Sequence, residues 1–508
     1  MKSKALQTII VSTILIFTSP TVQSQSDNGK FFWSQFRGHN SSGIASIDAS
    51  PPIEFGPDKH VKWKVDLPEG TSSPVIWANQ LYLTGYIQDK GAILVLSLDR
   101  STGDFRWCDS IYPEKIEKYH SISCPAQSSV AADSDGIYVY AASFGVKSYN
   151  HEGDLQWEYP IPCPTKKWGH PVSPAVMEDK VIINLDYSGE KKRKLLALDK
   201  FSGEIAWSTL TFNDPPLKHF NSPGFSTPVR FNEQVIIHKN GGLASFSLDD
   251  GHALWWLPFV SNGISTPIVN DDHIYVTAFM ELAEGYRGAY FDYDTFDKFL
   301  AEFDADKNER ITREEIPDNM LIFDRPDNDI EDAVTLYLKG FFKNIDSDKN
   351  DTINNEEWAT TYNWAIEYVE DVGILAIKPE KQGELTWEDV LWNELSKSPE
   401  VPSPVAYNDC VYMLKNGGWL TCMDTKTGHI HYQERIGGTG AIIASPVIGN
   451  GHLYLASYNG IVRVIKAGKE PVVVSETKLP GQIAATPAIA GNDLYIRTSE
   501  SLFAFSEE

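Results

Sequence analysis

The stretches Asp99-Arg100-Ser101-Thr102-Gly103-Asp104-Phe105-Arg106-Trp107 and Asp199-Lys200-Phe201-Ser202-Gly203-Glu204-Ile205-Ala206-Trp207 are two copies of one pattern, and this pattern decides the fold. Each ends in Gly-x-x-x-Trp. The same spacing recurs in Gly153 with Trp157, Gly251 with Trp255, Gly383 with Trp387 and, with tyrosine, Gly428 with Tyr432. A sequence that repeats at intervals of 20 to 50 residues or so indicates repeated structural units.

A second marker opens each unit, and it is a small hydroxyl residue that is usually followed by proline. It occurs eight times, as Ser73-Pro74, Ser128-Ser129, Ser173-Pro174, Thr227-Pro228, Thr266-Pro267, Ser403-Pro404, Ser445-Pro446 and Thr486-Pro487. An alternating run of β-branched and aromatic residues follows each copy, for example Gln80-Leu81-Tyr82-Leu83. Such runs are typical of β-strands.

The spacing of the eight markers predicts an all-β, eight-bladed β-propeller of four-stranded antiparallel blades. Successive markers lie 55, 45, 54, 39, 137, 42 and 41 residues apart, and a repeat of about 40 to 50 residues is typical of one blade. The 137-residue interval holds one blade and an insertion over residues 280–372, which interrupts blade five. The strand expected at 61–65 precedes the first marker and should pair as the outer strand of blade eight, so that the ring closes.

These repeats resemble the PQQ-like quinoprotein β-propeller family, whose units pair a Ser-Pro-Val entry with an Asp-x-x-[ST]-Gly-x-x-x-Trp exit. The opening Trp33-Ser34-Gln35-Phe36-Arg37-Gly38 is also similar to the start of exported bacterial members. The resemblance covers most of residues 33–505 except the insertion. It implies the fold and not one activity, because this fold hosts unrelated functions. The repeated tryptophans are predicted to dock one blade against the next.

The expected organisation has five parts. Residues 1–24 form a signal peptide, 25–60 an N-terminal extension, 61–279 blades one to five with the closing strand, 280–372 the insertion, and 373–508 the rest of blade five and blades six to eight. Lys2 and Lys4 precede a short apolar run, which is typical of a secretory signal peptide. The alternative, a membrane anchor, needs a run of about 20 residues. The mature chain is therefore predicted to be periplasmic or extracellular.

The insertion contains two twelve-residue loops with the pattern D-x-D-x-N-x-x-I-x-x-x-E, at 304–315 and 346–357. Oxygen ligands at positions 1, 3, 5, 7, 9 and 12 are the pattern by which an EF-hand binds Ca²⁺. The insertion resembles the EF-hand family over about 291–369, and we expect a small α-helical EF-hand pair. The predicted ligands are Asp304, Asp306, Asn308, the Arg310 carbonyl, Thr312 and Glu315, and Asp346, Asp348, Asn350, the Thr352 carbonyl, Asn354 and Glu357.

Apolar stripes predict helices over 294–303, 330–345 and 358–369. Both loops lack the glycine usual at position 6, where Glu309 and Asp351 stand. The left-handed conformation of that position costs a non-glycine residue about 1 kcal/mol, so we expect binding weakened by less than about tenfold. The second loop is expected to bind more tightly. The alternative is a pair of solvated acidic turns without metal.

Charge supports a cation-binding role. The chain has a net charge of −25, which disfavours nucleic acid and anionic lipid as partners. Residues 280–372 hold 25 acidic and 9 basic residues, so most of the excess lies in the insertion. Calcium there is either structural or a switch that opens the helices, and the sequence leaves both open.

No catalytic residue is predicted. The alternative function, a PQQ- and calcium-dependent quinoprotein dehydrogenase, is typified by a pair of adjacent cysteines beside the quinone, and no two of the five cysteines adjoin. PQQ is therefore not expected. His170 and Asn184-Leu185-Asp186 could converge in the channel, but isolated polar residues of this kind more often shape turns. Cys410 and Cys422 are expected opposite each other, either as a cross-strand disulfide or as two buried thiols.

The predicted function is that of an exported, calcium-binding PQQ-like propeller that acts as a non-catalytic binding or scaffolding module. Its partners would be Ca²⁺ and an unidentified protein or small-molecule ligand. No segment after the N-terminal one is long and apolar enough to span a membrane.

Overall fold

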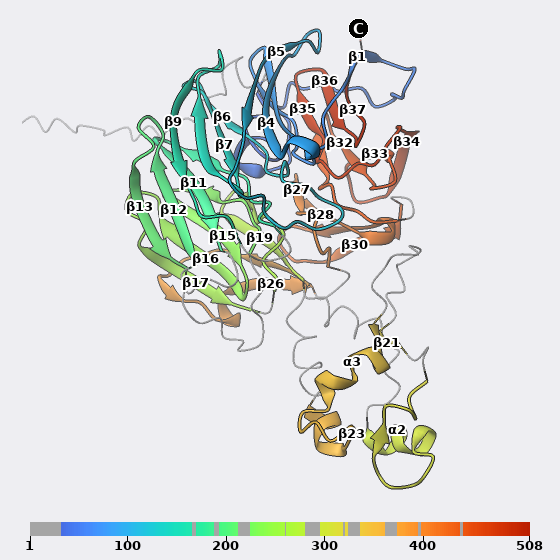
Figure 1. Cartoon of the computed structure of the whole chain (residues 1–508). Helices are drawn as coiled ribbons and strands as arrows, with labels where there is room; N and C mark the ends of the chain where they lie inside the picture. Colours follow the sequence, from blue (N-terminus) through green and yellow to red (C-terminus); the bar gives the residue numbers. More distant parts are fainter. Residues whose placement is uncertain are drawn as a thin grey trace, which may run out of the picture.

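The computed structural model describes residues 32–164, 169–186, 193–211, 224–259, 261–279, 295–317, 321–323, 336–360, 373–394, 398–436 and 440–507. Eight β-sheets of four strands, one of them extended by a fifth, follow one another around a ring (Figure 1). The four strands of each blade pair antiparallel, and tight turns join most of the strands that are neighbours in sequence. The eight-bladed all-β propeller is confirmed.

The strands of the first four blades are as follows. Blade one has β2 (Val75–Trp77), β3 (Gln80–Ile87), β4 (Ala92–Asp99) and β5 (Phe105–Ile111), and blade two has β6 (Ala131–Ala132), β7 (Ile137–Ala141), β8 (Gly145–Tyr149) and β9 (Leu155–Pro160). Blade three has β10 (Ala175–Met177), β11 (Lys180–Leu185), β12 (Lys194–Asp199) and β13 (Ile205–Leu210), and blade four has β14 (Val229–Phe231), β15 (Gln234–Lys239), β16 (Gly242–Ser247) and β17 (Ala253–Pro258).

The other four blades follow the same order. Blade five has β18 (Ile268–Asn270), β19 (His273–Ala278), β24 (Gly373–Ile377) and β26 (Val390–Glu394), and blade six has β27 (Val405–Tyr407), β28 (Cys410–Lys415), β29 (Trp419–Asp424) and β30 (Ile430–Arg435). Blade seven has β31 (Val447–Gly449), β32 (His452–Ala456), β33 (Ile461–Lys466) and β34 (Val472–Lys478), and blade eight has β35 (Ala488–Ala490), β36 (Asp493–Arg497), β37 (Ser501–Ser506) and β1 (Val61–Asp66).

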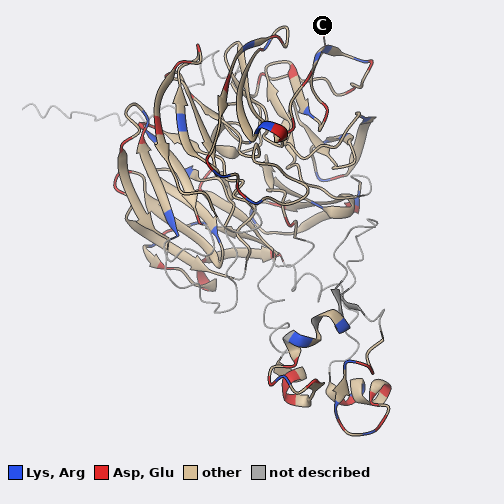
Figure 2. Cartoon of the chain, in the orientation of Figure 1, with Lys and Arg blue, Asp and Glu red and all other residues tan. Residues whose placement is uncertain are grey.

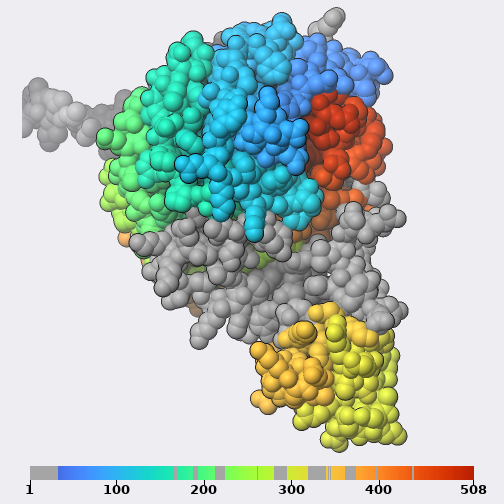
Figure 3. Space-filling view, viewed as in Figure 1, coloured from blue at the N-terminus to red at the C-terminus, as the bar shows by residue number. Residues whose placement is uncertain are grey.

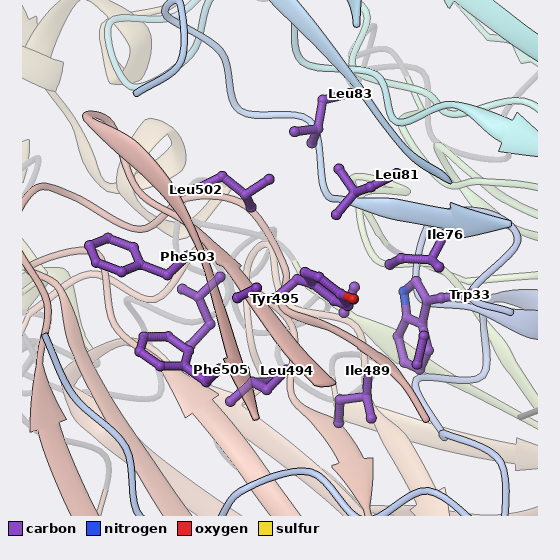
Figure 4. Packing of buried hydrophobic residues seen from close by; sticks show 14 of the residues in the cluster. Trp33, Ile76, Leu81, Leu83, Ile489, Leu494, Tyr495, Leu502, Phe503 and Phe505 are labelled. Atoms are coloured by element: carbon purple, nitrogen blue, oxygen red, sulfur yellow. The ribbon is translucent and has the colours of Figure 1, made fainter. Parts of the chain in front are cut away.

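The predicted closing strand is confirmed. β1 pairs antiparallel with β37, with Lys64 opposite Phe503 and Asp66 opposite Ser501. The N-terminal and C-terminal ends of the ring therefore share one sheet. The core at this seam combines Ile76, Leu81 and Leu83 of blade one with residues of blade eight such as Leu494 and Phe505 (Figure 4).

The hydroxyl residue of the entry marker joins seven of the eight pairs of neighbouring blades around the inside of the ring. Its oxygen accepts the backbone N–H of the same marker position in the preceding blade, at 2.9–3.1 Å, in seven links. They run from Ser73 to Ser129, Ser129 to Ser173, Thr227 to Thr266, Thr266 to Ser403, Ser403 to Ser445, Ser445 to Thr486 and Thr486 back to Ser73. The marker therefore needs a hydroxyl, which serine and threonine both provide.

We predict that Ser403→Ala destabilises the ring and that Ser403→Thr does not. Alanine would leave the buried N–H of Thr266 without its acceptor, and an unsatisfied buried donor costs about 1–3 kcal/mol. The midpoint of urea unfolding should therefore fall for alanine only. Equal midpoints for the two variants would contradict this role.

The repeated tryptophans dock blade against blade, as predicted. Trp63, Trp107, Trp157 and Trp207 donate their indole N–H to a backbone carbonyl in the next blade, at 2.8–3.0 Å. The glycine of the Gly-x-x-x-Trp pattern in the next blade has a positive φ and packs directly on the indole. A Cβ at this glycine would approach ring atoms to 2.4–2.7 Å. These glycines are Gly103, Gly153, Gly203 and Gly251.

Blade five departs from the expected pattern. Gly383–Glu384 (β25) pairs in parallel with β17 of blade four, and Trp387 lies in the 3₁₀ helix Trp387–Asp389, 41% exposed. The docking residue is Trp392 of β26, whose indole donates to the Thr425 carbonyl at 3.0 Å. The prediction for Trp387 is wrong because the chain leaves the blade to add a strand to blade four.

Trp255 also departs from the pattern. Its indole N–H donates to Gln234 Oε1 within its own blade, at 2.9 Å, and not to a carbonyl of blade five. The segment β25, which belongs to the blade-five part of the chain, pairs with β17. Gly383 of β25 therefore lies opposite Trp255 in the extended sheet of blade four.

The segment before β1 is more than an extension. Trp33 forms a two-way backbone bridge with Ile76 of blade one, and Asn40 exchanges two hydrogen bonds with the backbone of Arg230 in blade four. Ile44 bridges to Ile448 of blade seven. Because Ile76, Arg230 and Ile448 all lie on innermost strands, this segment must cross the axis of the ring and occupy its channel.

Arg37 of the same segment is fully buried, and its Nη2 donates to the Pro404 carbonyl at 2.5 Å. Pro404 follows the hydroxyl residue of the sixth marker, so the guanidinium reaches the level of the hydrogen-bonded marker ring. Burial lowers the pKa of Arg37 to about 9.

Cys410 and Cys422 are not opposite each other. Cys410 pairs with Asp424 and Cys422 with Tyr412, because the turn centres on Gly417 and not on Asn416. All five cysteines are free thiols.

The insertion leaves blade five between β19 and β24 and forms a lobe beside the ring (Figures 1 and 3). The predicted signal peptide lies outside the described residues. Within the described part of the chain, no helix has the length and apolar character needed to cross a membrane.

Candidate metal centres

In the described part of the inserted lobe, a short helix precedes each of the two loops. α2 (Phe296–Phe303) precedes the first loop and α3 (Leu338–Ile345) the second. Of the predicted helix over 330–345, residues 330–335 lie outside the described residues. Leu336–Tyr337 (β22) pairs with Leu321–Phe323 (β21), and the helix α3 covers the rest. Residues 355–360 are helical after the second loop, and the rest of the predicted helix over 358–369 lies outside the described residues.

A small apolar core joins the two halves. The Phe299 ring stacks on Trp358, with ring centroids 4.4 Å apart, and Phe342, Ile345 and Ile316 complete the cluster. Ile311 of β20 (Ile311–Thr312) pairs with Ile353 of β23 (Thr352–Ile353), both fully buried. The two loops therefore meet through a short antiparallel β contact at their eighth positions, where both carry isoleucine.

In the first loop, carboxylate oxygens of Asp304, Asp306 and Glu315 lie within 4.8 Å of one another. Backbone N–H groups hold them in place. Asp304 accepts from Asn308 at 3.1 Å and from Glu309 at 2.9 Å, and Glu315 accepts from Ala305 at 3.0 Å and Thr312 at 2.8 Å. Burial raises the pKa of Glu315, but the hydrogen bonds from Thr312 and Ala305 outweigh it and lower this pKa below its ordinary value.

The second loop repeats this arrangement with Asp346, Asp348 and Glu357, whose oxygens also lie within 4.8 Å. Asp346 accepts from Asn350 and Asp351 at 3.0 Å each, and Glu357 accepts from Ser347 at 2.8 Å and Asn354 at 3.1 Å. Asp346 and Glu357 are buried here, whereas Asp304 and Glu315 of the first loop are half-buried.

Both loops take the tight turn that position 6 requires. Glu309 has φ 62° and Asp351 φ 61°, and the lysines at position 4 are also left-handed, with φ 57° at Lys307 and 60° at Lys349. Two L residues per loop therefore hold a conformation that disfavours a Cβ. This loop conformation holds three carboxylates close together, and their mutual repulsion favours a cation among them.

The side chains of the other predicted ligands lie in the same loops, but they make different hydrogen bonds. The Asn308 and Asn350 side chains donate to Asp306 and Asp348 at 2.8 Å. Asn354 Oδ1 accepts the N–H of Glu357 at 3.0 Å and so caps the following helical turn. Thr312 Oγ1 donates to Glu315 Oε2 at 2.9 Å.

A side-chain hydrogen bond also joins the two loops. Arg310 Nη1 donates to Thr352 Oγ1 at 3.1 Å, and both residues hold position 7, whose carbonyls are the predicted ligands. Acidic residues gather around both loops (Figure 2). These oxygen sets fit the six to eight oxygen ligands of Ca²⁺, and the assignment of calcium stays a prediction.

The structure brings together the polar residues that the sequence placed near the channel. Gly224 links them: its N–H donates to the Asp186 carbonyl at 3.0 Å, and the His170 ring hydrogen-bonds the Gly224 backbone. Burial lowers the pKa of His170 to about 3, so its ring is neutral. Lys239 and Asn240 complete this cluster and were missed, although His238-Lys239-Asn240 is a polar end on an otherwise apolar strand run.

The fold and these loops define a closed eight-bladed β-propeller that carries a paired, carboxylate-rich insertion. The family described as PQQ_2, outer membrane protein assembly factor BamB, matches residues 191–299 and 359–508, just over half of the chain. The chain belongs to this PQQ-like propeller family.

Relatives of known name agree with this family. An outer membrane protein assembly factor BamB of Moranella endobia (strain PCIT) is 24% identical over 380 residues, which span 73% of this chain and 80% of the relative. The crystal structure of BamB from Moraxella catarrhalis has a TM-score of 0.50 at 11% identity, over 88% of this chain and 99% of that one. A europium-containing methanol dehydrogenase reaches 0.59 at 8% identity, over 94% and 98%. Such low identities establish the fold alone.

Proposed function

We propose that this protein is a non-catalytic scaffold of the cell envelope, which takes part in the assembly of outer membrane proteins. The observation that carries this proposal is the kinship to proteins named outer membrane protein assembly factors. The predicted export of the chain to the periplasm agrees with this kinship, because such a factor works in the envelope. A methanol dehydrogenase shares the fold, but at 8% identity that likeness carries no inference about a quinone cofactor.

The inserted lobe is proposed to hold two Ca²⁺ ions that stabilise it. In each loop, three carboxylates would supply charge and the carbonyl of Arg310 or Thr352 a further oxygen. The carboxylates repel one another without a cation, and the ion would offset that repulsion. A lobe stiffened in this way presents a second surface beside the ring, tethered at both ends to blade five.

Removing the gene from its host should lower the amount of folded β-barrel protein in the outer membrane, and the full chain should restore it. Folded barrels are measured by their altered migration in unheated gel samples. A chain in which a Gly/Ser linker replaces residues 280–372 tests the lobe separately, and we expect it to fold but to restore less.

Unchanged barrel levels in the strain without the gene would contradict the assembly role. Full rescue by the linker chain would support the assembly role of the propeller and show that the lobe is not needed for it.

A further inference from the structure

The innermost strands of the blades present backbone groups to the channel. In an antiparallel pair, alternate residues direct their N–H and C=O away from the partner strand. Ile76, the middle residue of β2, lies opposite Leu81 and is such a residue. It exchanges two backbone hydrogen bonds with Trp33 of the N-terminal segment, at 2.8 and 2.9 Å (Figure 4). The inner edge of a blade can therefore bind a further extended segment.

The N-terminal segment uses the same position in two other blades. Ile448 of blade seven exchanges hydrogen bonds with the backbone of residues 43–45, at 2.7 and 2.8 Å. Arg230 of blade four bonds both amide atoms of the Asn40 side chain, at 2.7 and 2.8 Å. In blades one, four and seven, the inward N–H and C=O are therefore both paired with this segment.

Blade six has the same inner edge without this partner. Ala406 is the middle residue of β27 and lies opposite Val411, just as Ile448 lies opposite Leu453 in β31. Ala406 is 2% exposed, and its inward N–H and C=O form no hydrogen bond with any described residue. Buried backbone groups are nearly always paired. The inner edge of blade six therefore offers a donor and an acceptor that the N-terminal segment does not use.

A groove of about 470 Å³ lies along this edge, which is within the range of about 300–1,000 Å³ that is typical of ligand sites. Its walls are residues 44–47 of the N-terminal segment, residues 406–408 and 448–451 of blades six and seven, and Asn270 of blade five. Ile47 in this wall is 92% exposed, and Tyr407 is half-buried. The groove therefore combines unpaired backbone groups with apolar surface.

The charge beside the groove is negative. Asp48, Asp271 and Asp409 each adjoin a lining residue in the sequence, and all three are exposed. None of them forms an ion pair with a described residue, and the lining residues include no lysine or arginine. These three carboxylates favour a ligand that carries positive charge.

We propose that this groove binds an extended segment of a partner polypeptide that contains lysine or arginine. The segment pairs its backbone with the N–H and C=O of Ala406, as the N-terminal segment does with Ile76 and Ile448. Its apolar side chains contact Ile47 and Tyr407, and its cationic side chains lie near the three carboxylates. This inference rests on the geometry of the blades and not on the assembly role proposed above, so either can fail without the other.

The probe is the labelled peptide acetyl-Lys-Val-Thr-Val-Lys-amide, and its matched control carries N-methyl groups on the three central residues. N-methylation removes backbone donors and keeps both lysines, so attraction to the acidic lobe is the same for the two peptides. Fluorescence anisotropy on the full mature protein should show saturable binding of the first peptide and binding of the second that is weaker by at least about tenfold. Equal binding of the two, or no binding of the first, would overturn the proposal.

Ala406→Pro is the variant that removes the inward N–H donor. Proline is tolerated on an edge strand where the N–H faces away from the sheet, so the bonds between β27 and β28 stay in place. We expect peptide binding to weaken by at least about tenfold. Unchanged binding in the folded variant would contradict the assignment. The comparison of the two peptides on the unaltered protein decides if this variant fails to fold.

The charge of the groove is tested separately. Asp409→Asn should weaken binding of the lysine peptide, whereas Asp89→Asn should not, because Asp89 is an exposed carboxylate in the 3₁₀ helix Gln88–Lys90 of blade one and does not adjoin the groove. Equal weakening in the two variants would show general attraction between opposite charges and would contradict the site.

Discussion

Asp346→Asn should lower the affinity of the inserted lobe for Ca²⁺ more than Asp304→Asn does. Each change removes one carboxylate charge and keeps the side-chain shape, and we expect a loss of at least about tenfold, or about 1.4 kcal/mol, at the altered site. The second loop should be the tighter site because Asp346 and Glu357 are buried, whereas the first-loop carboxylates are more exposed to water that competes for the ion.

Calorimetric titration of the full mature protein measures both sites together. The unaltered protein should bind two ions. Asp304→Asn should remove the weaker phase and leave the tighter one, and Asp346→Asn should do the reverse. Loss of the tighter phase in Asp304→Asn would reverse the assigned order, and absence of any binding would show two solvated acidic turns.

Glu309→Gly is the opposite change and should tighten the first site. Glu309 holds φ 62°, a conformation that costs a residue with a Cβ about 1 kcal/mol and glycine almost nothing. That difference corresponds to about fivefold in affinity.

The stabilising role of the ion is tested by the melting temperature of the same proteins with and without EGTA. We expect EGTA to lower the melting temperature, and an unchanged value would contradict the stabilising role.

Arg100→Leu should destabilise the closed ring by about 3 kcal/mol. Arg100 reaches from blade one into blade eight, where Nη2 donates to the Ala490 carbonyl at 2.6 Å and lies 3.1 Å from Asp493 Oδ2. Nε donates to the Tyr495 hydroxyl at 3.0 Å. Removing one partner of a buried ion pair leaves the other without full compensation, which costs about 3–5 kcal/mol, and Lys62 retains part of the attraction to Asp493.

Arg106→Leu is the matched control in the same blade. Arg106 pairs with Asp99 at 2.5 Å on the surface, where an ion pair contributes less than about 1 kcal/mol. The urea midpoint should fall for Arg100→Leu and stay nearly constant for Arg106→Leu. Similar midpoints in the two variants would show that the seam does not depend on Arg100.

The same seam gives a direction for pH. Burial raises the pKa of Asp493, but its hydrogen bond and attraction to Lys62 and the charge of Arg100 outweigh burial, so the pKa is lowered. A carboxyl with a lowered pKa in the folded state contributes stability above its unfolded value and loses it as pH falls through the folded value. Lowering the pH through the folded pKa of Asp493 should therefore reduce the free energy of unfolding of the unaltered protein more than that of the Arg100→Leu variant.

The carboxylate cluster of each loop was predictable because its members lie within twelve consecutive residues. The spacing itself fixes which carboxylates meet, and even the pairing of Ile311 with Ile353 followed from the shared eighth position. The tryptophan of blade five was not predictable, since the chain between Gly383 and Trp392 leaves its own blade to pair with β17.

The sequence by itself determined the number of blades and the place of the insertion, because the strands of a blade follow one another along the chain and each marker sits at a fixed place among them. The closing strand was predictable because residues 61–65 precede the first marker. Only the tertiary structure decided what the ring brings together. It joined Ser73 to Thr486 across 413 residues, led the N-terminal segment through the channel and placed Asp186 against Asn240. Such contacts depend on ring closure, which sets distances that no short-range pattern records.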